Sequence, residues 1–210
     1  MAMDRLETAA LKQRFLQRWA NRHLGTLEHE RRVADIADTL FTLTRPRHDL
    51  GIQHRRLLAL GAVVHDVGRC DGEDGHEIAG AKMVLRDESL PLSGSERRAL
   101  AYLTRYHRGP VPETGDDRIL RDDDDHDTLR LTLALLRAAD AMDSRSLESP
   151  RLVFAMRNSG RLRIACYLDD DSAKARKVYG RRKKFKLLEE ILDVRVEIDV
   201  RFAEALSMVA

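Results

Sequence analysis

Six histidine and aspartate side chains interrupt otherwise apolar helix faces in this sequence. They are His29, His65, Asp66, His76, His107 and Asp140. Imidazoles and carboxylates are ligands for divalent metals, and a buried carboxylate is costly in free energy unless it is paired or bound to a cation. Two carboxylates among four imidazoles therefore predict a divalent-metal site.

Helical spacing places each of these side chains on the inner face of its segment. His65 shares a face with Leu58 and Ala62, and Asp140 shares one with Leu133. A single histidine on such a face is more often a hydrogen-bonded core residue than a ligand. Because five helical segments each deliver one or two of these groups, the metal site is favoured over that alternative.

The segments that must position these groups have helical periodicity up to about residue 146. We expect helices at 4–22, 26–44, 53–66, 76–86, 93–107 and 127–144. Thr26 is expected to cap the second helix, and Ser93 with Glu96 forms a capping box for the fifth. Ala79 and Gly80, beside His76, would let another backbone come close.

After Pro150 the apolar pattern alternates, which indicates strands near 152–156, 161–168 and 194–200, with a turn at 158–160 and a helix at about 172–191. The predicted fold class is mainly α, a helical bundle with a small antiparallel β/α appendage. We expect two domains, a bundle with the metal site at residues 1–150 and a small α+β subdomain at residues 151–210.

Composition excludes several classes of protein. The two cysteines, Cys70 and Cys166, are too few for a disulfide framework, so any metal must use histidine and carboxylate. No segment is apolar enough to span a membrane and no signal core is present, so we expect a cytoplasmic protein without a membrane partner. A formal net charge of +2 and the absence of a recognition motif predict no nucleic-acid partner.

His29, the His65-Asp66 doublet and Asp140 resemble, in order and context, the H…HD…D signature of the HD superfamily of metal-dependent phosphohydrolases. Segment 57–68 looks like the metal helix of that superfamily, and segment 135–143 looks like its last ligand helix. The motif Arg105-Tyr106-His107-Arg108 and the β-rich tail are similar to the C-terminal HD domain of the exopolyphosphatase/guanosine pentaphosphatase family.

The resemblance implies one metal held by His29, His65, Asp66 and Asp140. His76 and His107 would add a second metal, with Asp66 bridging, and the catalytic residues would be His65 and Asp66. Two cations about 3.5–4 Å apart lower the pKa of a shared water and neutralise phosphoryl charge. The expected cofactor is one or two divalent ions of Mn, Fe, Co, Zn or Mg.

Two departures limit this resemblance. The family normally carries an N-terminal actin-like module that holds its polyphosphatase site, and this sequence has no counterpart of it, so we do not expect polyphosphate hydrolysis to carry over. Where the family often has H-x-H-S, this sequence has His76-Glu77-Ile78-Ala79, which lacks one imidazole and one hydroxyl.

A phosphate also needs positive groups, and Arg69, Lys82 and Arg108 are the candidates nearest to the ligands in sequence. For each of them an ordinary solvated charge is the slightly better explanation. Arg137 and Asp143 lie one helical turn from Asp140 and are candidates to orient ligands, although Asp143 also fits a surface position. The basic run at 174–186 is better explained as a solvated helix face than as a site that steers a polyanion.

The first functional hypothesis is a metal-dependent phosphohydrolase that acts on a small phosphorylated substrate such as a nucleotide, an alarmone or a short polyphosphate. The second is a non-catalytic module that senses a nucleotide or docks onto an actin-like phosphatase domain. A structural helical protein is the third. A homodimer formed through the tail sheet stays open.

Overall fold

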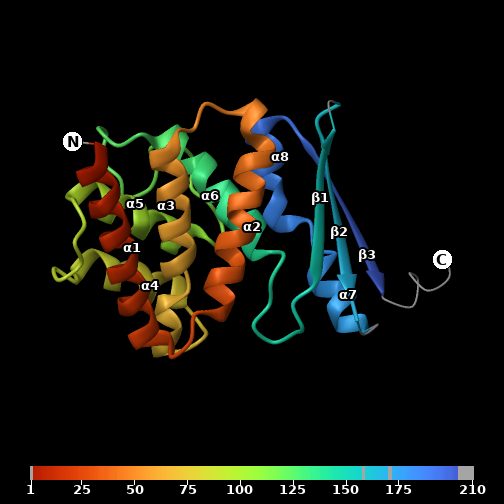
Figure 1. The fold of residues 1–210 in the computed structure, drawn as a ribbon, viewed down its shortest axis with the longest axis horizontal. Coiled ribbons are helices and arrows are strands. Elements are labelled where there is room, and N and C mark those ends of the chain that lie inside the picture. Colours follow the sequence, from red (N-terminus) through yellow and green to blue (C-terminus); the bar gives the residue numbers. More distant parts are fainter. Residues whose placement is uncertain (1, 158, 170–171, 203–210) are drawn as a thin grey trace.

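The computed structural model describes residues 2–157, 159–169 and 172–202 (Figure 1). The bundle consists of α1 (Ala2–Leu24), α2 (Glu28–Thr44), α3 (Ile52–Val64), α4 (His76–Arg86), α5 (Gly94–Tyr106) and α6 (His126–Asp140). The tail consists of β1 (Arg151–Arg157), β2 (Arg161–Leu168), α7 (Ala173–Tyr179), α8 (Lys186–Leu192) and β3 (Arg195–Phe202). Three 3₁₀ turns join these elements, η1 (Arg45–Arg47), η2 (Val67–Asp71) and η3 (Lys183–Phe185). The predicted fold class, a helical bundle with a small β appendage, is confirmed.

In the bundle, helix ends follow the sequence signals closely, with two exceptions. The Ser93 hydroxyl accepts a hydrogen bond from the Glu96 amide at 3.2 Å, so the predicted capping box is confirmed. The prediction that Thr26 caps α2 is wrong, because the buried Leu27 occupies the N-cap position. Helix α6 ends at Asp140, before the predicted residue 144, because the Met142 amide bonds back to the Ala139 carbonyl in a tight turn.

Helix α6 is central, as its nearly uniform apolar character predicts. Leu133, Leu135 and Leu136 are completely buried, and α2, α3, α5 and α8 all contact this helix. The same apolar cluster continues into the sheet and includes Leu162 and Ile164 of β2.

The division at residue 150 stays a prediction, and residues 203–210 of the second unit lie outside the described residues. In the described part of the chain, every helix lacks the length or the apolar character that crossing a bilayer requires.

The sheet has the order β1-β2-β3, and its strand directions correct one prediction. Strands β1 and β2 pair antiparallel, but β3 runs parallel to β2, with Arg195 opposite Arg161. Alternation of apolar residues shows which face of a strand is buried but not which way the strand runs. The connection through α7, η3 and α8 is long enough to return the chain to the starting end of β2, which a parallel pair requires.

The helix predicted over 172–191 is instead two helices. Helix α7 ends before Gly180, whose amide bonds back to the Arg176 carbonyl, and the chain then turns through η3 before α8 begins. This turn buries Phe185 completely. The predicted turn at 158–160 contains Asn158, which lies outside the described residues, and Gly160 within it has a φ of +75°.

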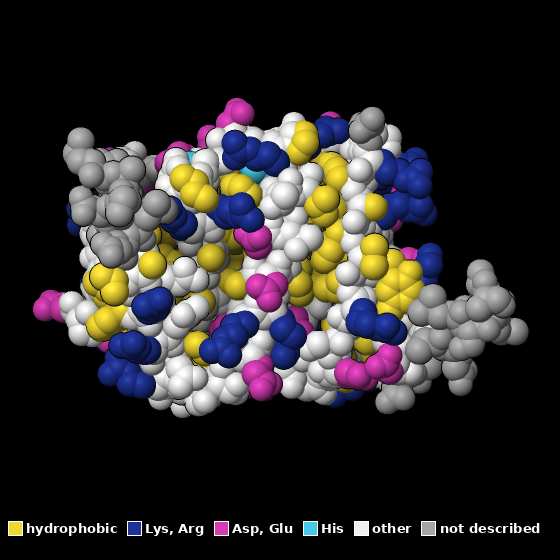
Figure 2. Space-filling model, viewed as in Figure 1, with side chains coloured by type: hydrophobic (Ala, Val, Ile, Leu, Met, Phe, Trp, Pro, Cys, Tyr) yellow, Lys and Arg dark blue, Asp and Glu magenta, His cyan; other side chains and the backbone are white. Residues whose placement is uncertain are grey.

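Strand β1 forms one edge of the sheet. Its inner residues Leu152, Phe154 and Met156 are half-buried against the core, whereas Val153 on the outer face is 56% exposed. Figure 2 shows a band of apolar side chains at this end of the viewed face. A homodimer formed through the sheet stays a prediction.

Candidate metal centre

The fold brings all six predicted ligands together at helix ends. His29 lies in the first turn of α2, the His65-Asp66 doublet follows α3, and His76 begins α4. His107 follows α5 directly, and Asp140 ends α6. Five of these residues are at most 5% exposed, and the Asp140 side chain is 10% exposed. A buried cluster of this composition is what the sequence pattern predicts.

The ligand atoms form two overlapping triads. His29, His65 and Asp66 make up one, and Asp66, His76 and His107 make up the other; in each, the ligand atoms lie within 4.8 Å of one another. Asp66 Oδ1 is 3.0 Å from His76 Nε2 and 3.4 Å from His107 Nε2. Asp66 therefore stands where a bridging carboxylate would stand.

Asp140 adds a carboxylate to the first triad. Its Oδ1 atom lies 3.4 Å from His29 Nε2 and 3.6 Å from His65 Nε2. The same two imidazoles thus face both Asp66 and Asp140. The geometry gathers the four residues that the resemblance implies for one metal, and their role as ligands stays a prediction.

Three imidazoles of the cluster each make the same kind of local hydrogen bond, in which Nδ1 donates to the backbone carbonyl of the residue three positions earlier. They are His65 on Ala62 at 2.8 Å, His76 on Glu73 at 2.7 Å and His107 on Thr104 at 2.7 Å. A carbonyl only accepts, so Nδ1 carries a proton, and in the neutral imidazole Nε2 then keeps a lone pair. In the neutral form, each of these histidines presents a nitrogen lone pair to the cluster.

These lone pairs lack donors within the described protein. His76 Nε2 and His107 Nε2 are 3.3 Å apart, and with both imidazoles neutral their lone pairs would repel each other at that distance. His65 Nε2 is buried without a hydrogen-bond partner among the described residues. An unpaired buried acceptor costs about 1–3 kcal/mol, a cost that a bound cation removes. Nitrogen lone pairs next to carboxylates are the donor set of a divalent metal, and the residues fit that group.

The two carboxylates of the cluster are ionised. Burial favours the neutral acid of Asp66, but the neighbouring imidazoles of His65, His107 and His76 hold its pKa well below the usual range. Burial likewise opposes ionisation of Asp140, but Lys184, His29 and His65 lower its pKa well below the usual value. Both groups can therefore bind a cation without first losing a proton.

We expect the affinity for divalent cations to rise with pH up to about 9. Burial opposes the charged imidazole of His29, but hydrogen bonds to Asp140 and Asp143 raise the pKa of His29 to about 9. Below that pH an incoming cation must displace the proton, so apparent affinity gains up to about tenfold per pH unit for each proton released. Calorimetric titration with Mn²⁺ at several pH values measures this slope.

The exposed His23 provides the control for this titration. His23→Gln should keep the wild-type slope of Mn²⁺ affinity against pH, since its imidazole lies outside the cluster. A wild-type affinity that stays constant between about pH 6 and 9 would contradict the prediction.

A second layer of polar groups orients His29. Asp143 is 5% exposed, and its Oδ2 accepts a hydrogen bond from His29 Nδ1 at 2.6 Å. Its Oδ1 accepts from Arg32 Nε at 2.8 Å and from Ser149 Oγ at 2.9 Å. Of the two interpretations that the sequence leaves open for Asp143, the structure favours the orienting residue.

Arg137 acts on the backbone around His107 rather than on a ligand side chain. Its guanidinium donates to the Tyr106 carbonyl at 2.5 Å and to the Gly109 carbonyl at 3.0 Å. The turn that carries His107 is thereby tied to α6, the helix that carries Asp140.

Two of the three predicted phosphate-binding residues lie at the cluster. Arg69 Nε is 3.7 Å from Asp66 Oδ2, and an Arg108 guanidinium nitrogen is 3.4 Å from His76 Nδ1. Lys82 is not brought there, since it is exposed on α4 and lines a separate hollow beside Trp19. The reason is helical rotation, because six residues after His76 a side chain points about 120° away from it.

Sequence reasoning missed three charged residues of the centre. Arg145 Nε donates to Asp66 Oδ2 at 2.9 Å and also pairs with the fully buried carboxylate of Glu30. Lys184 forms an ion pair with Asp140 Oδ2. Helical spacing could have found Glu30, which shares a face of α2 with Val33, but no local pattern marks Arg145 or Lys184.

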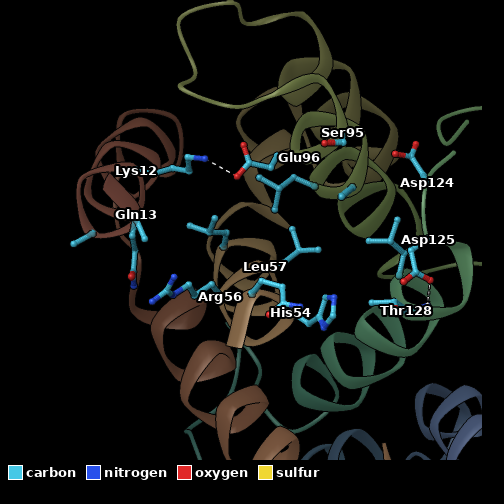
Figure 3. A pocket seen from close by; sticks show the side chains of 17 residues that line it. Lys12, Gln13, His54, Arg56, Leu57, Ser95, Glu96, Asp124, Asp125 and Thr128 are labelled. Atoms are coloured by element: carbon cyan, nitrogen blue, oxygen red, sulfur yellow. Dashed lines mark hydrogen bonds and ion pairs between the residues drawn. The ribbon is translucent and has the colours of Figure 1, made fainter. Parts of the chain in front are cut away.

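A hollow of about 760 Å³ lies elsewhere, between α1, α3, α5 and the start of α6 (Figure 3). Lys12 and Glu96 form an ion pair in its wall at 2.5 Å, and Asp125 caps α6 by accepting from the Thr128 amide at 3.1 Å. None of the six candidate ligands lines this hollow. It is therefore separate from the candidate metal centre.

The fold and the site together define the class of protein: it is a helical domain that carries a buried candidate centre for a divalent metal. The family model for the Ppx/GppA phosphatase, domain III, matches residues 11–159, and the chain belongs to this family. The sequence resemblance to the C-terminal domain of the exopolyphosphatase/guanosine pentaphosphatase family is thereby confirmed. All six candidate ligands lie within the matched residues, whereas Lys184 lies beyond them. Comparison with curated proteins finds no significant match.

Proposed function

We propose that this chain is a metal-dependent phosphohydrolase that cleaves a phosphoester or phosphoanhydride of a small phosphorylated compound, such as a nucleotide, an alarmone or a short polyphosphate. The observation that carries the proposal is the pair of triads that share Asp66. Membership of a phosphatase family supports the same reaction class. A buried ligand cluster flanked by arginines suits a substrate that carries negative phosphoryl oxygens.

In this proposal His29, His65 and Asp140 would hold one divalent cation, His76 and His107 would hold a second, and Asp66 would be available to either. When bound, the cations would supply positive charge to the phosphoryl oxygens and lower the pKa of water, so that hydroxide is available to attack phosphorus. Mn, Fe, Co, Zn and Mg are the candidate ions, since mixed imidazole and carboxylate ligands suit each of them to some degree.

The residues of the chain perform the remaining tasks. The hydrogen bonds on Nδ1 keep the Nε2 lone pairs of His65, His76 and His107 directed into the cluster. Asp143 does the same for His29. The side chains of Arg69 and Arg145 are 24% and 25% exposed and lie next to Asp66, so they place fixed positive charge on the solvent side of the ligands.

The test combines metal analysis with an activity screen. Purified protein should contain one or two divalent transition metals per chain and should release phosphate from at least one compound in a panel of nucleotides, polyphosphates and phosphomonoesters. Chelation should abolish that activity, and one of the candidate ions should restore it. A protein that binds no divalent metal, or a metal-loaded protein that releases no phosphate from the panel, would refute the proposal.

A second candidate function is a non-catalytic module that senses a nucleotide or docks onto an actin-like phosphatase domain. The observation in its favour is that the matching family model describes one domain of a phosphatase, domain III. In that case metal is bound, the panel yields no phosphate, and a nucleotide raises the melting temperature.

A further inference from the structure

Lys184 is the one member of the basic run at 174–186 that an ion pair connects to the metal centre within the described residues. The side chains of Lys183 and Lys186 are exposed, as a solvated face predicts, whereas the Lys184 side chain is only 33% exposed. Its ammonium lies against Asp140 Oδ2. The solvated-face interpretation therefore fails at this position.

The position of Lys184 is set by the apolar residues that follow it. Phe185 and Leu188 are completely buried, and η3 and α8 both pack on α6, the helix that ends at Asp140. Figure 1 shows α8 between the bundle and the sheet. The C-terminal unit thus carries a lysine to a cluster that is otherwise built from the helical bundle.

Asp140 presents its two oxygens to different neighbours. Oδ1 lies near the Nε2 atoms of His29 and His65, whereas Oδ2 contacts Lys184. An ammonium group has three N–H donors, and the contact with Asp140 occupies only one of them. Since a third of the side chain is exposed, the other donors can reach a ligand that arrives from solvent.

Arg145 differs from Lys184 in this respect. Its guanidinium is shared between Asp66 and the buried Glu30, so two carboxylates hold it in place. Lys184 has one carboxylate partner at the centre and a flexible four-carbon stem. Of the two basic side chains that sequence reasoning missed, Lys184 is the one whose N–H donors are not all engaged by carboxylates.

On the basis of the proposed function, we propose that Lys184 is a phosphate-binding residue of this centre, contributed by the C-terminal unit. It neutralises Asp140 in the protein without ligands. When cations and a phosphate are bound, its ammonium would donate to a phosphoryl oxygen, and the cation in place of Lys184 would neutralise Asp140.

The experiment measures binding of inorganic phosphate to the Mn²⁺-loaded full chain by calorimetry, so that it does not depend on turnover. Lys184→Gln should weaken phosphate binding by about tenfold or more, the size of a lost charged hydrogen bond, and should keep the bound Mn²⁺. Lys183→Gln, the matched control at the adjacent exposed lysine, should stay within about twofold of the wild type. Lys184→Arg should recover part of the affinity, because it restores a positive donor.

Three results would overturn the inference: an unchanged phosphate affinity in Lys184→Gln, a loss of Mn²⁺ together with phosphate, or no phosphate binding by the Mn²⁺-loaded wild type. The second result would make Lys184 only a structural partner of Asp140. A wild type that binds phosphate through Lys184 but hydrolyses no substrate would keep the inference and refute the proposed hydrolase.

Discussion

Asp66→Asn is expected to lower phosphatase activity by more than about a thousandfold and to reduce bound metal to less than one ion per chain. Asp66 is the residue common to both triads, so its loss would remove a candidate ligand from each of them. Asparagine keeps the size of the side chain but loses the negative charge that would attract a cation to the cluster. It also places an amide group where His76 Nε2 now lies 3.0 Å from a carboxylate oxygen.

The measurement is metal content by mass spectrometry together with phosphate release from the best substrate of the wild type. Asp35→Asn makes the same chemical change at an exposed site on α2, and it should leave both quantities unchanged. Circular dichroism separates lost ligands from lost structure. If Asp66→Asn retains two ions per chain while folded, the shared-carboxylate arrangement is wrong, whatever happens to activity.

Most of the centre could be predicted because helical periodicity reports which side chains point inward. His29, His76 and Asp140 each align with apolar neighbours, and burial of those neighbours carries the polar group into the core. Convergence of the six groups then needs only that the helices pack on one another. The prediction that Gly80 admits a second backbone is confirmed too, since a Cβ there would lie 3.0 Å from the Gly68 amide nitrogen.

The basic residues of the centre could not be predicted in the same way. Lys82 lies near His76 in sequence but points away from it, whereas Lys184 is 44 residues from Asp140 and contacts it. A long lysine stem can carry its charge away from the side on which its backbone lies, so periodicity does not report the position of the charge. Only the tertiary placement of η3 decides that Lys184 reaches the cluster.

The direction of β3 illustrates a second limit. Val196 is buried and Arg195 exposed, as alternation predicts, and both a parallel and an antiparallel partner would satisfy that pattern. What decides the direction is the path of the chain through α7 and α8. That path depends on the break at Gly180, which a basic helical pattern does not reveal.

The backbone contact that positions His76 against Asp66 depends on Gly68. A Cβ at this residue would lie 2.1 Å from the His76 carbonyl oxygen and 2.4 Å from the Gly80 amide nitrogen. Both are backbone atoms of α4, which cannot rotate aside as a side chain can. The η2 turn that follows Asp66 and the first turns of α4 can therefore approach this closely only with glycine at position 68.

We expect Gly68→Ala to lower the free energy of unfolding by about 3 kcal/mol, because α4 must move away to accept the methyl group. That movement separates His76 from Asp66, so the affinity for the second Mn²⁺ should fall as well. Gly94→Ala is the control, since its Cβ would meet only Arg98 at 3.5 Å, and stability should change by less than about 1 kcal/mol. Urea unfolding and Mn²⁺ titration measure the two effects. If Gly68→Ala and Gly94→Ala have equal free energies of unfolding, the close approach of η2 to α4 at Gly68 is wrong.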